Sequence, residues 1–231
     1  MTVDEAKKEA ARAALTELPP SGVVGLGSGS TAKLFIAEVG ALVRSGSPFR
    51  GVPTSEGSRA QALDLGIPLL GDEGPWDIAV TVDGADEVDA NLNLIKGGGA
   101  AHTREKIVNF ATRKNVIIVD ESKLSTLLGE KWPVPVEVLR FADKATARAL
   151  ARIGRAEQRK RTSANGASEP VITDSGNFIY DLFVGPIADP GALDRAIRDV
   201  PGVVETGLFV GRADVVIVAG PNGVRRLTRG R

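Results

Sequence analysis

The chain has 231 residues, which is enough for one large domain or two small ones. Lys and Arg together number 29, as do Asp and Glu, so the formal net charge is zero and gives no support for binding to nucleic acid or to an acidic membrane. The absence of cysteine and the presence of a single histidine, His102, exclude thiolate catalysis, disulfides, Cys-based zinc sites and metal sites built from several histidines. The chemistry must therefore come mainly from carboxylates, lysines, hydroxyls and backbone amides.

The N-terminal segment is charged, and its amphipathic pattern predicts a helix up to Leu18 that ends at Pro19-Pro20. It lacks the apolar core of a secretory signal, and nowhere does the sequence reach the ~18 consecutive apolar residues of a membrane span. We therefore expect a cytoplasmic protein.

Short apolar runs then alternate with helical patterns. This alternation predicts a doubly wound, mostly parallel sheet with helices on both faces, which is a Rossmann-like α/β domain. The clearest strand candidates are Val23–Gly27, Phe49–Pro53, Asp77–Val82 and Val116–Val119, and weaker ones are Ile67–Leu70 and Leu92–Ile95.

The pattern changes near Pro133, where a strand, a helix from Asp143 to Ile153 and a hairpin signal follow one another. In the hairpin, Val171–Thr173 and Phe178–Val184 flank a turn of Asp, Ser, Gly and Asn. A helix and a strand come next, and the order strand–helix–strand–strand–helix–strand predicts a small, ferredoxin-like α+β domain.

The domain boundaries follow from these patterns. Asp214–Ala219 is rich in β-formers and is expected to rejoin the first sheet. We therefore assign residues 1–130 and 207–231 to the Rossmann-like catalytic domain, and residues 131–206 to the small α+β domain.

Ligands of open parallel sheets bind at the carboxyl ends of the strands. Four polar or glycine-rich clusters of this sequence fall at such ends, and four clusters from one sheet predict a shared crevice. They are Gly27–Thr31, Asp83–Asp86, Lys96–Gly99 and Asp120–Lys123.

The first cluster, Gly27–Thr31, has backbone amides, hydroxyls and a helix N-terminus, which suit a phosphate. A tight turn with a Ser/Thr helix cap is an equally good interpretation. The spacing Gly27-x-Gly29-x-x-Ala32 also loosely fits a dinucleotide fingerprint, but Glu56 lies too far along the chain to be its acidic ribose partner.

The second cluster places Asp83 and Asp86 directly after a buried strand. Two carboxylates there can bind sugar hydroxyls, move a proton or hold a divalent cation, or they can be ordinary turn residues. We favour hydroxyl binding, because the nearby lysine makes a metal less necessary.

In the third cluster Lys96 precedes three glycines, which indicates close approach of backbone to a ligand, or else a hinge. Glu105 follows in the first turn of a helix that Thr103 can cap, and it is a candidate general base or a partner of the helix dipole.

Lys123 of the fourth cluster is a phosphate ligand or part of a charged helix cap. We leave His102 out of the mechanism. The basic run Arg159–Arg161 is interpreted as a solvated strand or loop, in preference to a nucleic-acid contact.

These clusters resemble the signature blocks of ribose-5-phosphate isomerase, type A, in order and spacing. Further blocks in the second half match too, so the resemblance extends over nearly the whole chain. The blocks are Gly25–Ala32, Asp83–Glu87, Lys96–Ala101 with Arg104–Lys106, Asp120–Lys123, Pro133–Val138, Thr173–Asn177, Pro201–Val204 and Gly207–Phe209.

The resemblance implies interconversion of D-ribose 5-phosphate and D-ribulose 5-phosphate, in the non-oxidative pentose phosphate pathway, with no metal or nucleotide cofactor. It implies that Glu105 moves a proton between C2 and C1 through an enediolate, and that Asp83 assists ring opening or proton movement between the sugar oxygens. Lys96 and the glycine amides would stabilise the oxyanion. The implied substrate-binding set is Ser28, Gly29, Ser30, Thr31, Asp83, Gly84, Ala85, Asp86, Lys96, Gly97, Gly98, Gly99, Lys123 and Lys7.

The same resemblance implies a homodimer or a dimer of dimers, with the small domain as the contact. Departures from the family are small: Ser28 stands where Thr is common, and His102 where an apolar residue is common.

Two other functions stay open. One is a sugar-phosphate-sensing module, for which we find no spare segment that could form a helix-turn-helix; the other is a nicotinamide-dependent dehydrogenase, which rests on the weak glycine fingerprint.

Overall fold

The computed structural model describes residues 1–163 and 166–229. The chain divides into two compact units, each built from separate stretches of sequence. The first unit comprises Met1–Ala85, Arg104–Lys123 and the chain from Gly211 onward; the second comprises Asp86–Thr103 and Leu124–Val210. Within the described residues, no helix is long and apolar enough to cross a membrane.

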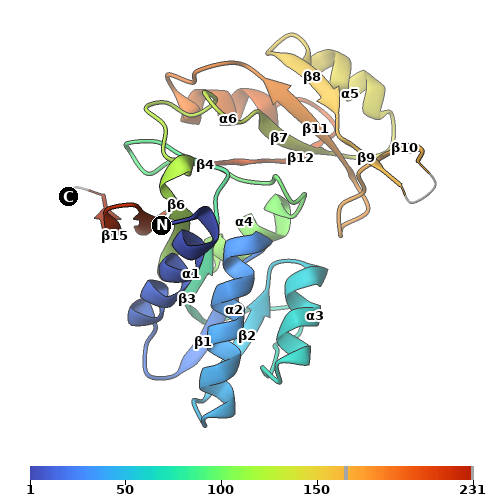
Figure 1. Cartoon of the computed structure of the whole chain (residues 1–231). Coiled ribbons are helices and arrows are strands. Elements are labelled where there is room, and N and C mark those ends of the chain that lie inside the picture. Colours follow the sequence, from blue (N-terminus) through green and yellow to red (C-terminus); the bar gives the residue numbers. More distant parts are fainter. Residues whose placement is uncertain (164–165, 230–231) are drawn as a thin grey trace. The chain divides into compact units, whose positions relative to one another are not determined.

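A mostly parallel sheet forms the centre of the first unit, with strand order β15-β14-β6-β3-β1-β2 (Figure 1). Every pairing is parallel except that of β15 with β14. The Rossmann-like prediction is therefore confirmed, and the segment near residue 215 does rejoin this sheet. The strands are β1 (Gly22–Leu26), β2 (Phe49–Pro53), β3 (Ile78–Asp83), β6 (Asn115–Asp120), β14 (Val215–Gly220) and β15 (Gly223–Thr228).

Helices cover both faces of this sheet. On one face, α1 buries a stripe of alanines, Ala6, Ala10 and Ala14, against the strands and α2. Spacing of four residues puts these small side chains on one side of the helix, which lets α1 approach the sheet closely. On the other face, Val108 of α4 packs with Val23 of β1. The helical elements here are α1 (Val3–Ala14), the 3₁₀ turn η1 (Leu15–Glu17), α2 (Gly29–Arg44), α3 (Glu56–Asp64), α4 (His102–Phe110) and the 3₁₀ turn η2 (Glu121–Lys123).

The second unit contains an antiparallel sheet with strand order β12-β7-β11-β8 (Figure 1). When the four strands are numbered along the chain, their order in the sheet is 4-1-3-2. One helix lies between the first and second strands and another between the third and fourth, so the ferredoxin-like prediction is confirmed. Its elements are β7 (Val134–Val138), α5 (Asp143–Leu150), β8 (Arg155–Gln158), β11 (Phe178–Phe183), α6 (Pro190–Arg198) and β12 (Val203–Thr206). The short strands β9 (Lys160–Thr162) and β10 (Ser168–Pro170) pair with each other.

The predicted hairpin needs a correction. Val171–Thr173 is not a strand, and only one isolated bridge, between Ile172 and Phe178, joins it to β11. The predicted turn does close, since the N–H of Thr173 donates to the carbonyl oxygen of Asn177 at 2.9 Å. The reason is that both edges of β11 are already occupied, one by β7 and the other by β8. Similarly, the predicted strand near residues 67–70 is reduced to one bridge between Leu69 and Gly51.

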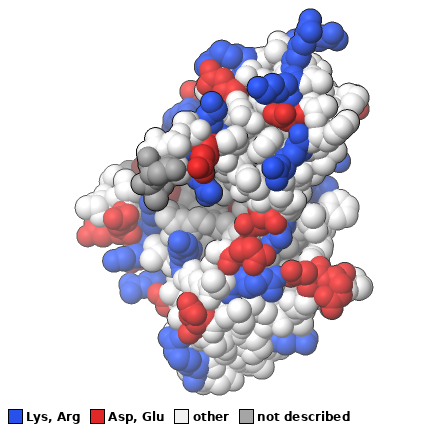
Figure 2. Space-filling view, turned by 90° about the vertical axis from the view of Figure 1, so that its right-hand side faces the viewer, with Lys and Arg blue, Asp and Glu red and all other residues white. Residues whose placement is uncertain are grey.

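The unit boundaries also differ from those expected. Residues 86–103, 124–130 and 207–210, which we assigned to the first domain, belong to the second unit. The cause is a small sheet in which β5 (Leu94–Ile95) pairs with both β4 (Glu87–Val88) and β13 (Leu208–Phe209). Of the four clusters placed on one sheet, Lys96–Gly99 therefore follows a strand of this other sheet. On the face shown in Figure 2, acidic and basic side chains are interspersed, in keeping with the zero net charge.

Candidate functional site

The carboxyl edge of the first unit's sheet brings together several of the predicted site residues. Three parallel strands end there, β1 before Gly27–Thr31, β3 at Asp83 and β6 before Glu121–Lys123. Because parallel strands present their carboxyl ends at one edge, segments far apart in sequence meet at the usual ligand position of such sheets.

Asp83 is held firmly at this edge. It is 3 % exposed, and its Oδ1 accepts hydrogen bonds from the N–H of Ser28 at 2.9 Å and of Gly84 at 2.7 Å. Gly27 makes this approach possible, because a Cβ at that position would lie 2.3 Å from Asp83 Oδ1 and 2.6 Å from Asp83 Cα. The first glycine of the motif is therefore required to bring the loop after β1 against the end of β3.

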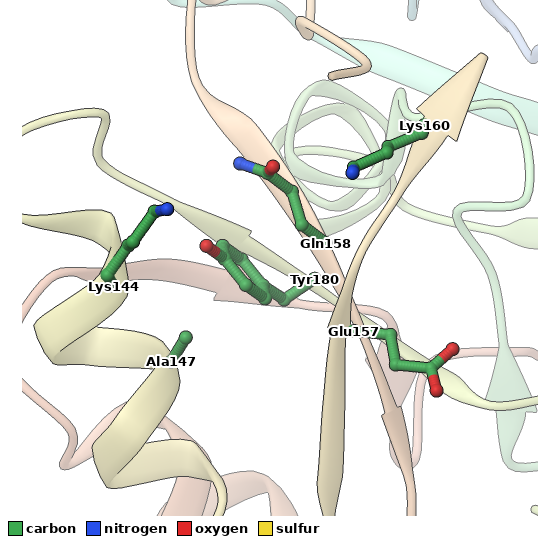
Figure 3. A pocket seen from close by; sticks show the side chains of 6 residues that line it. All are labelled: Lys144, Ala147, Glu157, Gln158, Lys160 and Tyr180. Carbon is green, nitrogen blue, oxygen red and sulfur yellow. The ribbon is translucent and has the colours of Figure 1, made fainter. Parts of the chain in front are cut away.

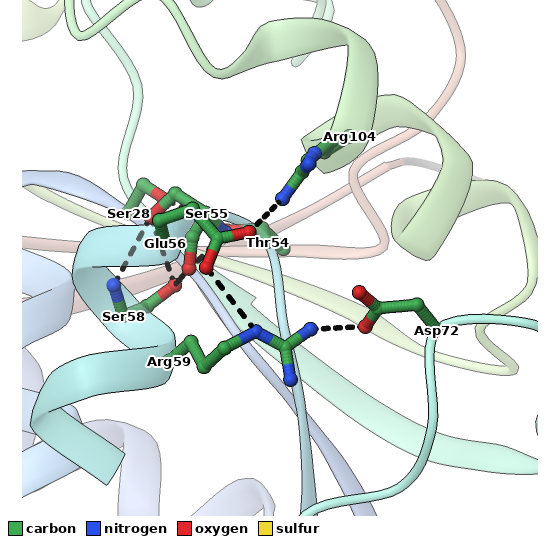
Figure 4. A network of polar contacts seen from close by, with 8 residues as sticks. All are labelled: Ser28, Thr54, Ser55, Glu56, Ser58, Arg59, Asp72 and Arg104. Carbon is green, nitrogen blue, oxygen red and sulfur yellow. Dashed lines mark hydrogen bonds and ion pairs between the residues drawn. The ribbon is translucent and has the colours of Figure 1, made fainter. Parts of the chain in front are cut away.

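The loop after β1 leads into α2 and leaves the N-terminus of this helix available to a ligand. Ser28 occupies the N-cap position, but its side chain makes no capping hydrogen bond. Its Oγ lies instead 2.8 Å from Thr54 Oγ1 and 2.7 Å from Ser55 Oγ (Figure 4). Gly29 and Ser30, in the first turn, are exposed. Uncapped N–H groups at the start of a helix favour an anion, so this geometry supports the phosphate interpretation over the cap.

The residues that follow β2 were not among the predicted site residues, yet they contact the loop after β1. Thr54 and Ser55 contact Ser28, and the next residue, Glu56, accepts a hydrogen bond from Arg104 Nη1 at 2.6 Å (Figure 4). The other oxygen of Glu56 pairs with Arg59, which in turn pairs with Asp72 (Figure 4). The available signal was the pair of hydroxyl residues directly after a predicted strand.

Three further predicted residues belong to the first unit. Glu105 lies in the first turn of α4 and is 5 % exposed. Lys7 lies on α1, with its Nζ 3.8 Å from Asp4 Oδ1, and Lys123 ends the turn η2 directly after β6. A buried carboxylate is suited to acid–base work because little water competes with its substrate.

The glycine cluster belongs to the second unit. Lys96 is buried, its N–H donates to the carbonyl oxygen of Gly207 at 2.9 Å, and its Nζ lies 5.5 Å from the ring centroid of Phe209. The N–H of Gly98 donates to Asp86 Oδ2 at 2.7 Å. The structure therefore joins Asp86 and the glycine loop, which we define as Lys96–Gly99, in one hydrogen-bonded arrangement.

His102 has a packing role in this arrangement. It is fully buried, and its Nε2 lies 3.3 Å from the carbonyl oxygen of Glu205. Gly97 has a φ of +107°, and a Cβ there would lie 2.6 Å from His102 Nδ1. The ring thus packs directly against Gly97, which explains why that position is glycine.

A buried carboxylate supports the start of α4. Thr103 was expected to cap the helix, but α4 begins at His102 and the Thr103 hydroxyl donates to Glu137 at 2.5 Å. Glu137 is buried and also accepts hydrogen bonds from Thr173 Oγ1 at 2.9 Å and Asn177 Nδ2 at 2.8 Å. Such satisfied buried networks hold a segment in one orientation.

A separate open pocket of about 530 Å³ lies in the second unit (Figure 3). Lys144, Gln158, Lys160 and Tyr180 are among its lining residues, and the Tyr180 hydroxyl donates to Asp143 Oδ2 at 2.6 Å. Burial, together with this hydrogen bond, raises the pKa of Tyr180 above its ordinary value. None of the predicted site residues lines this pocket.

The chain is similar to known proteins over its whole length. Residues 50–223 match the family model of ribose 5-phosphate isomerase A (phosphoriboisomerase A). The chain is 44 % identical to ribose-5-phosphate isomerase A of Thermococcus kodakarensis, over 99 % of this chain and 100 % of that protein, and 46 % identical to that of Methanothermobacter thermautotrophicus, over 96 % of each.

Solved structures give the same result. A D-ribose-5-phosphate isomerase in complex with phospho-erythronic acid superposes with a TM-score of 0.92 at 43 % identity, covering 99 % of this chain and 100 % of the other. Ribose 5-phosphate isomerase from Plasmodium falciparum superposes with a TM-score of 0.91 at 36 % identity and the same coverage.

Proposed function

Because the chain belongs to the ribose 5-phosphate isomerase A family and is an isomerase, we propose that it interconverts D-ribose 5-phosphate and D-ribulose 5-phosphate, in the non-oxidative pentose phosphate pathway. The observation that carries the proposal is the similarity over the full length of both chains. The arrangement of Asp83, Ser28 and the uncapped helix α2 within the first unit supports it, because together they suit a phosphorylated sugar.

In the proposed reaction, the Glu105 carboxylate removes the proton from C2 of the open-chain aldose. The C–H electron pair forms a C1–C2 double bond, and the carbonyl electrons move to O1, which gives an enediolate. The proton on O2 is then transferred to O1. Glu105 returns its proton to C1 while the carbonyl re-forms at C2, so the ketose results with no net change in atoms or electrons.

We assign Asp83 to the transfer of the proton between O2 and O1, and to ring opening. The fixed orientation of its carboxylate supports this role, since a proton carrier must hold its geometry through the reaction. Lys96 and the amides of the glycine loop are assigned to the negative charge that develops on the sugar oxygens.

We assign the substrate phosphate to the N-terminus of α2, which carries the hydroxyl groups of Ser30 and Thr31. Lys7 and Lys123 would add positive charge.

Assembly and location are further parts of the proposal. We expect a homodimer or a dimer of dimers that contacts through the small α+β domain and works in the cytoplasm. Sedimentation equilibrium on the purified protein tests the assembly, and a monomer at micromolar concentration contradicts it.

The first experiment is conversion of ribose 5-phosphate by the purified protein in EDTA, for wild type and Glu105→Gln. Loss of a general base typically costs about 10²–10⁴-fold, so we expect the variant to lose at least 100-fold in kcat while keeping its thermal unfolding midpoint. Glu169→Gln, which changes an exposed carboxylate on β10, is the matched control and should retain wild-type activity.

The outcomes separate the parts of the proposal. An active wild type with a fully active Glu105→Gln overturns the role of Glu105 but not the reaction. A wild type that binds ribose 5-phosphate without converting it favours a sugar-phosphate-sensing module or a different phosphorylated sugar as substrate.

A further inference from the structure

The basic run at residues 159–161 contains one arginine whose surroundings differ from those of its neighbours. Lys160 and Arg161 are exposed on β9, whereas the Arg159 side chain is only 15 % exposed. Its backbone is fixed from both sides, since its N–H donates to the carbonyl oxygen of Ile179 at 2.8 Å and its carbonyl oxygen accepts from Val171 at 2.9 Å. The interpretation of the whole run as solvated is therefore wrong for Arg159.

Arg159 forms a two-sided contact within the second unit. One side of its guanidinium faces Asp181 of β11, with Nε 2.9 Å from Oδ2 and Nη2 bonded to Oδ1. The other side faces the glycine loop, where Nη1 donates to the carbonyl oxygen of Gly97 at 2.6 Å and of Gly98 at 3.1 Å. Arg is suited to this because its planar fork holds several donors in fixed directions.

The hydrogen bonds from Arg159 to the carbonyl groups of Gly97 and Gly98 also orient the N–H groups of the loop. In a trans peptide the C=O and the following N–H point in opposite directions, and the loop peptides are trans. With the Gly97 carbonyl directed at Arg159, the N–H of Gly98 points away from it and reaches Asp86. With the Gly98 carbonyl held in the same way, the N–H of Gly99 also points away from Arg159.

The loop needs such support because its own conformational preferences are weak. Three consecutive glycines have the widest choice of φ and ψ, and Gly98 and Gly99 are exposed. A turn bond from the N–H of Ala100, the residue after the loop, reaches the carbonyl oxygen of Gly97 at 2.9 Å. A catalytic amide acts only if it is oriented before the reaction, so a flexible loop must be held from outside.

We propose that Arg159 is a positioning residue for isomerisation: braced by Asp181, it holds the carbonyl groups of Gly97 and Gly98 and so fixes the loop, with the N–H of Gly98 on Asp86 and the N–H of Gly99 directed away from Arg159, toward the reacting sugar oxygens. This inference rests on the proposed function, in which that loop stabilises the oxyanion. Arg159 itself does not touch the substrate.

The test compares Arg159→Lys with Arg155→Lys. Lysine keeps the charge but cannot hold Asp181 and two carbonyl groups at once. Arg155 lies on the adjacent strand β8 and pairs with exposed Glu157, with no bond to the loop, so its variant controls for an Arg-to-Lys change in the same sheet. We expect Arg159→Lys to lower kcat about 10–100-fold with KM changed less than about threefold, because misorientation of about 1 Å is costly in the transition state.

Amide hydrogen exchange measured by NMR supplies a second readout. Exchange at the N–H of Gly98 should become at least tenfold faster in Arg159→Lys and stay unchanged in Arg155→Lys. A third variant, Asp181→Asn, leaves the guanidinium but weakens its brace, and should lower kcat less than Arg159→Lys does, with KM again nearly constant.

The outcomes are distinguishable. The proposal is overturned if Arg159→Lys keeps kcat within twofold, or if kcat falls only in proportion to the folded fraction. If wild type itself does not isomerise ribose 5-phosphate, the proposed function fails, and the exchange data then decide whether Arg159 orients the loop: unchanged exchange at Gly98 refutes it, and faster exchange supports it.

Discussion

Replacement of Gly27 by alanine tests the close approach on which the orientation of Asp83 depends. A Cβ at this position would lie 2.6 Å from Asp83 Cα, whereas carbon atoms in good contact are about 3.5 Å apart. The end of β3 or the loop after β1 must therefore move by about 1 Å. The contact involves backbone, so no side-chain rotation can relieve it.

The displacement has two consequences of different size. Overpacking of this kind costs about 1–3 kcal/mol, which for a chain of this length lowers the unfolding midpoint by roughly 2–12 °C. Asp83 is the proposed proton carrier, and misplacement of such a carboxylate by about 1 Å costs on the order of 10²-fold in kcat. The variant should therefore fold at 25 °C and yet lose most of its activity.

The assay is kcat for ribose 5-phosphate isomerisation at 25 °C, together with thermal unfolding. Gly57→Ala is the matched control, because it lies in the first turn of α3 and an added Cβ meets only Ser55 Oγ at 3.8 Å. It should keep wild-type kcat. A Gly27→Ala protein with kcat within threefold of wild type would show that the orientation of Asp83 does not depend on this contact.

Two further predictions concern stability. Glu17 lies 2.7 Å from Arg226 and 2.5 Å from Lys114, and its pKa is lowered, most strongly by the Arg226 hydrogen bond. The contribution of Glu17 to the free energy of unfolding is complete above the ordinary pKa of about 4.3, and it is lost as pH falls through the lowered pKa. Between pH 7 and pH 3, urea unfolding should therefore show a smaller loss of stability for Glu17→Gln than for wild type. Identical dependence of stability on pH in the two proteins would contradict this. Tyr180→Phe removes the hydroxyl that donates to Asp143 and should lower the free energy of unfolding by about 0.5–3 kcal/mol in urea titrations, with kcat unchanged; equal stability would refute a role for that hydrogen bond.

Local patterns in the sequence predicted the fold class of both units. Runs such as Val116–Val119 are apolar over their full length, which is typical of a strand buried on both faces, and glycines or acidic residues mark where such strands end. The ferredoxin-like order was also predicted, but its second strand was placed at Val171–Thr173, whereas β8 takes that position.

The strands that sequence analysis missed lack that local signal. β8 has the sequence Arg-Ala-Glu-Gln and is a strand only because the edge of β11 is there to pair with it. β4 has only two residues, too few for any periodicity, and the pairing of β5 with β4 and β13 is what assigns the glycine loop to the second unit. Strand pairing is a non-local interaction, so it has no trace in a short window of sequence.

The sequence by itself determined which residue types are available for the chemistry, since a chain without cysteine and with one histidine leaves carboxylates, lysines and glycine-rich loops. Only the tertiary structure decided how these residues are held. Arg159 is indistinguishable by composition from Arg161 two positions later, and its role follows from Asp181 and the Gly97 carbonyl, which lie 22 and 62 positions away. A side chain is buried or solvated according to what the rest of the chain packs against it, and that is a property of the fold.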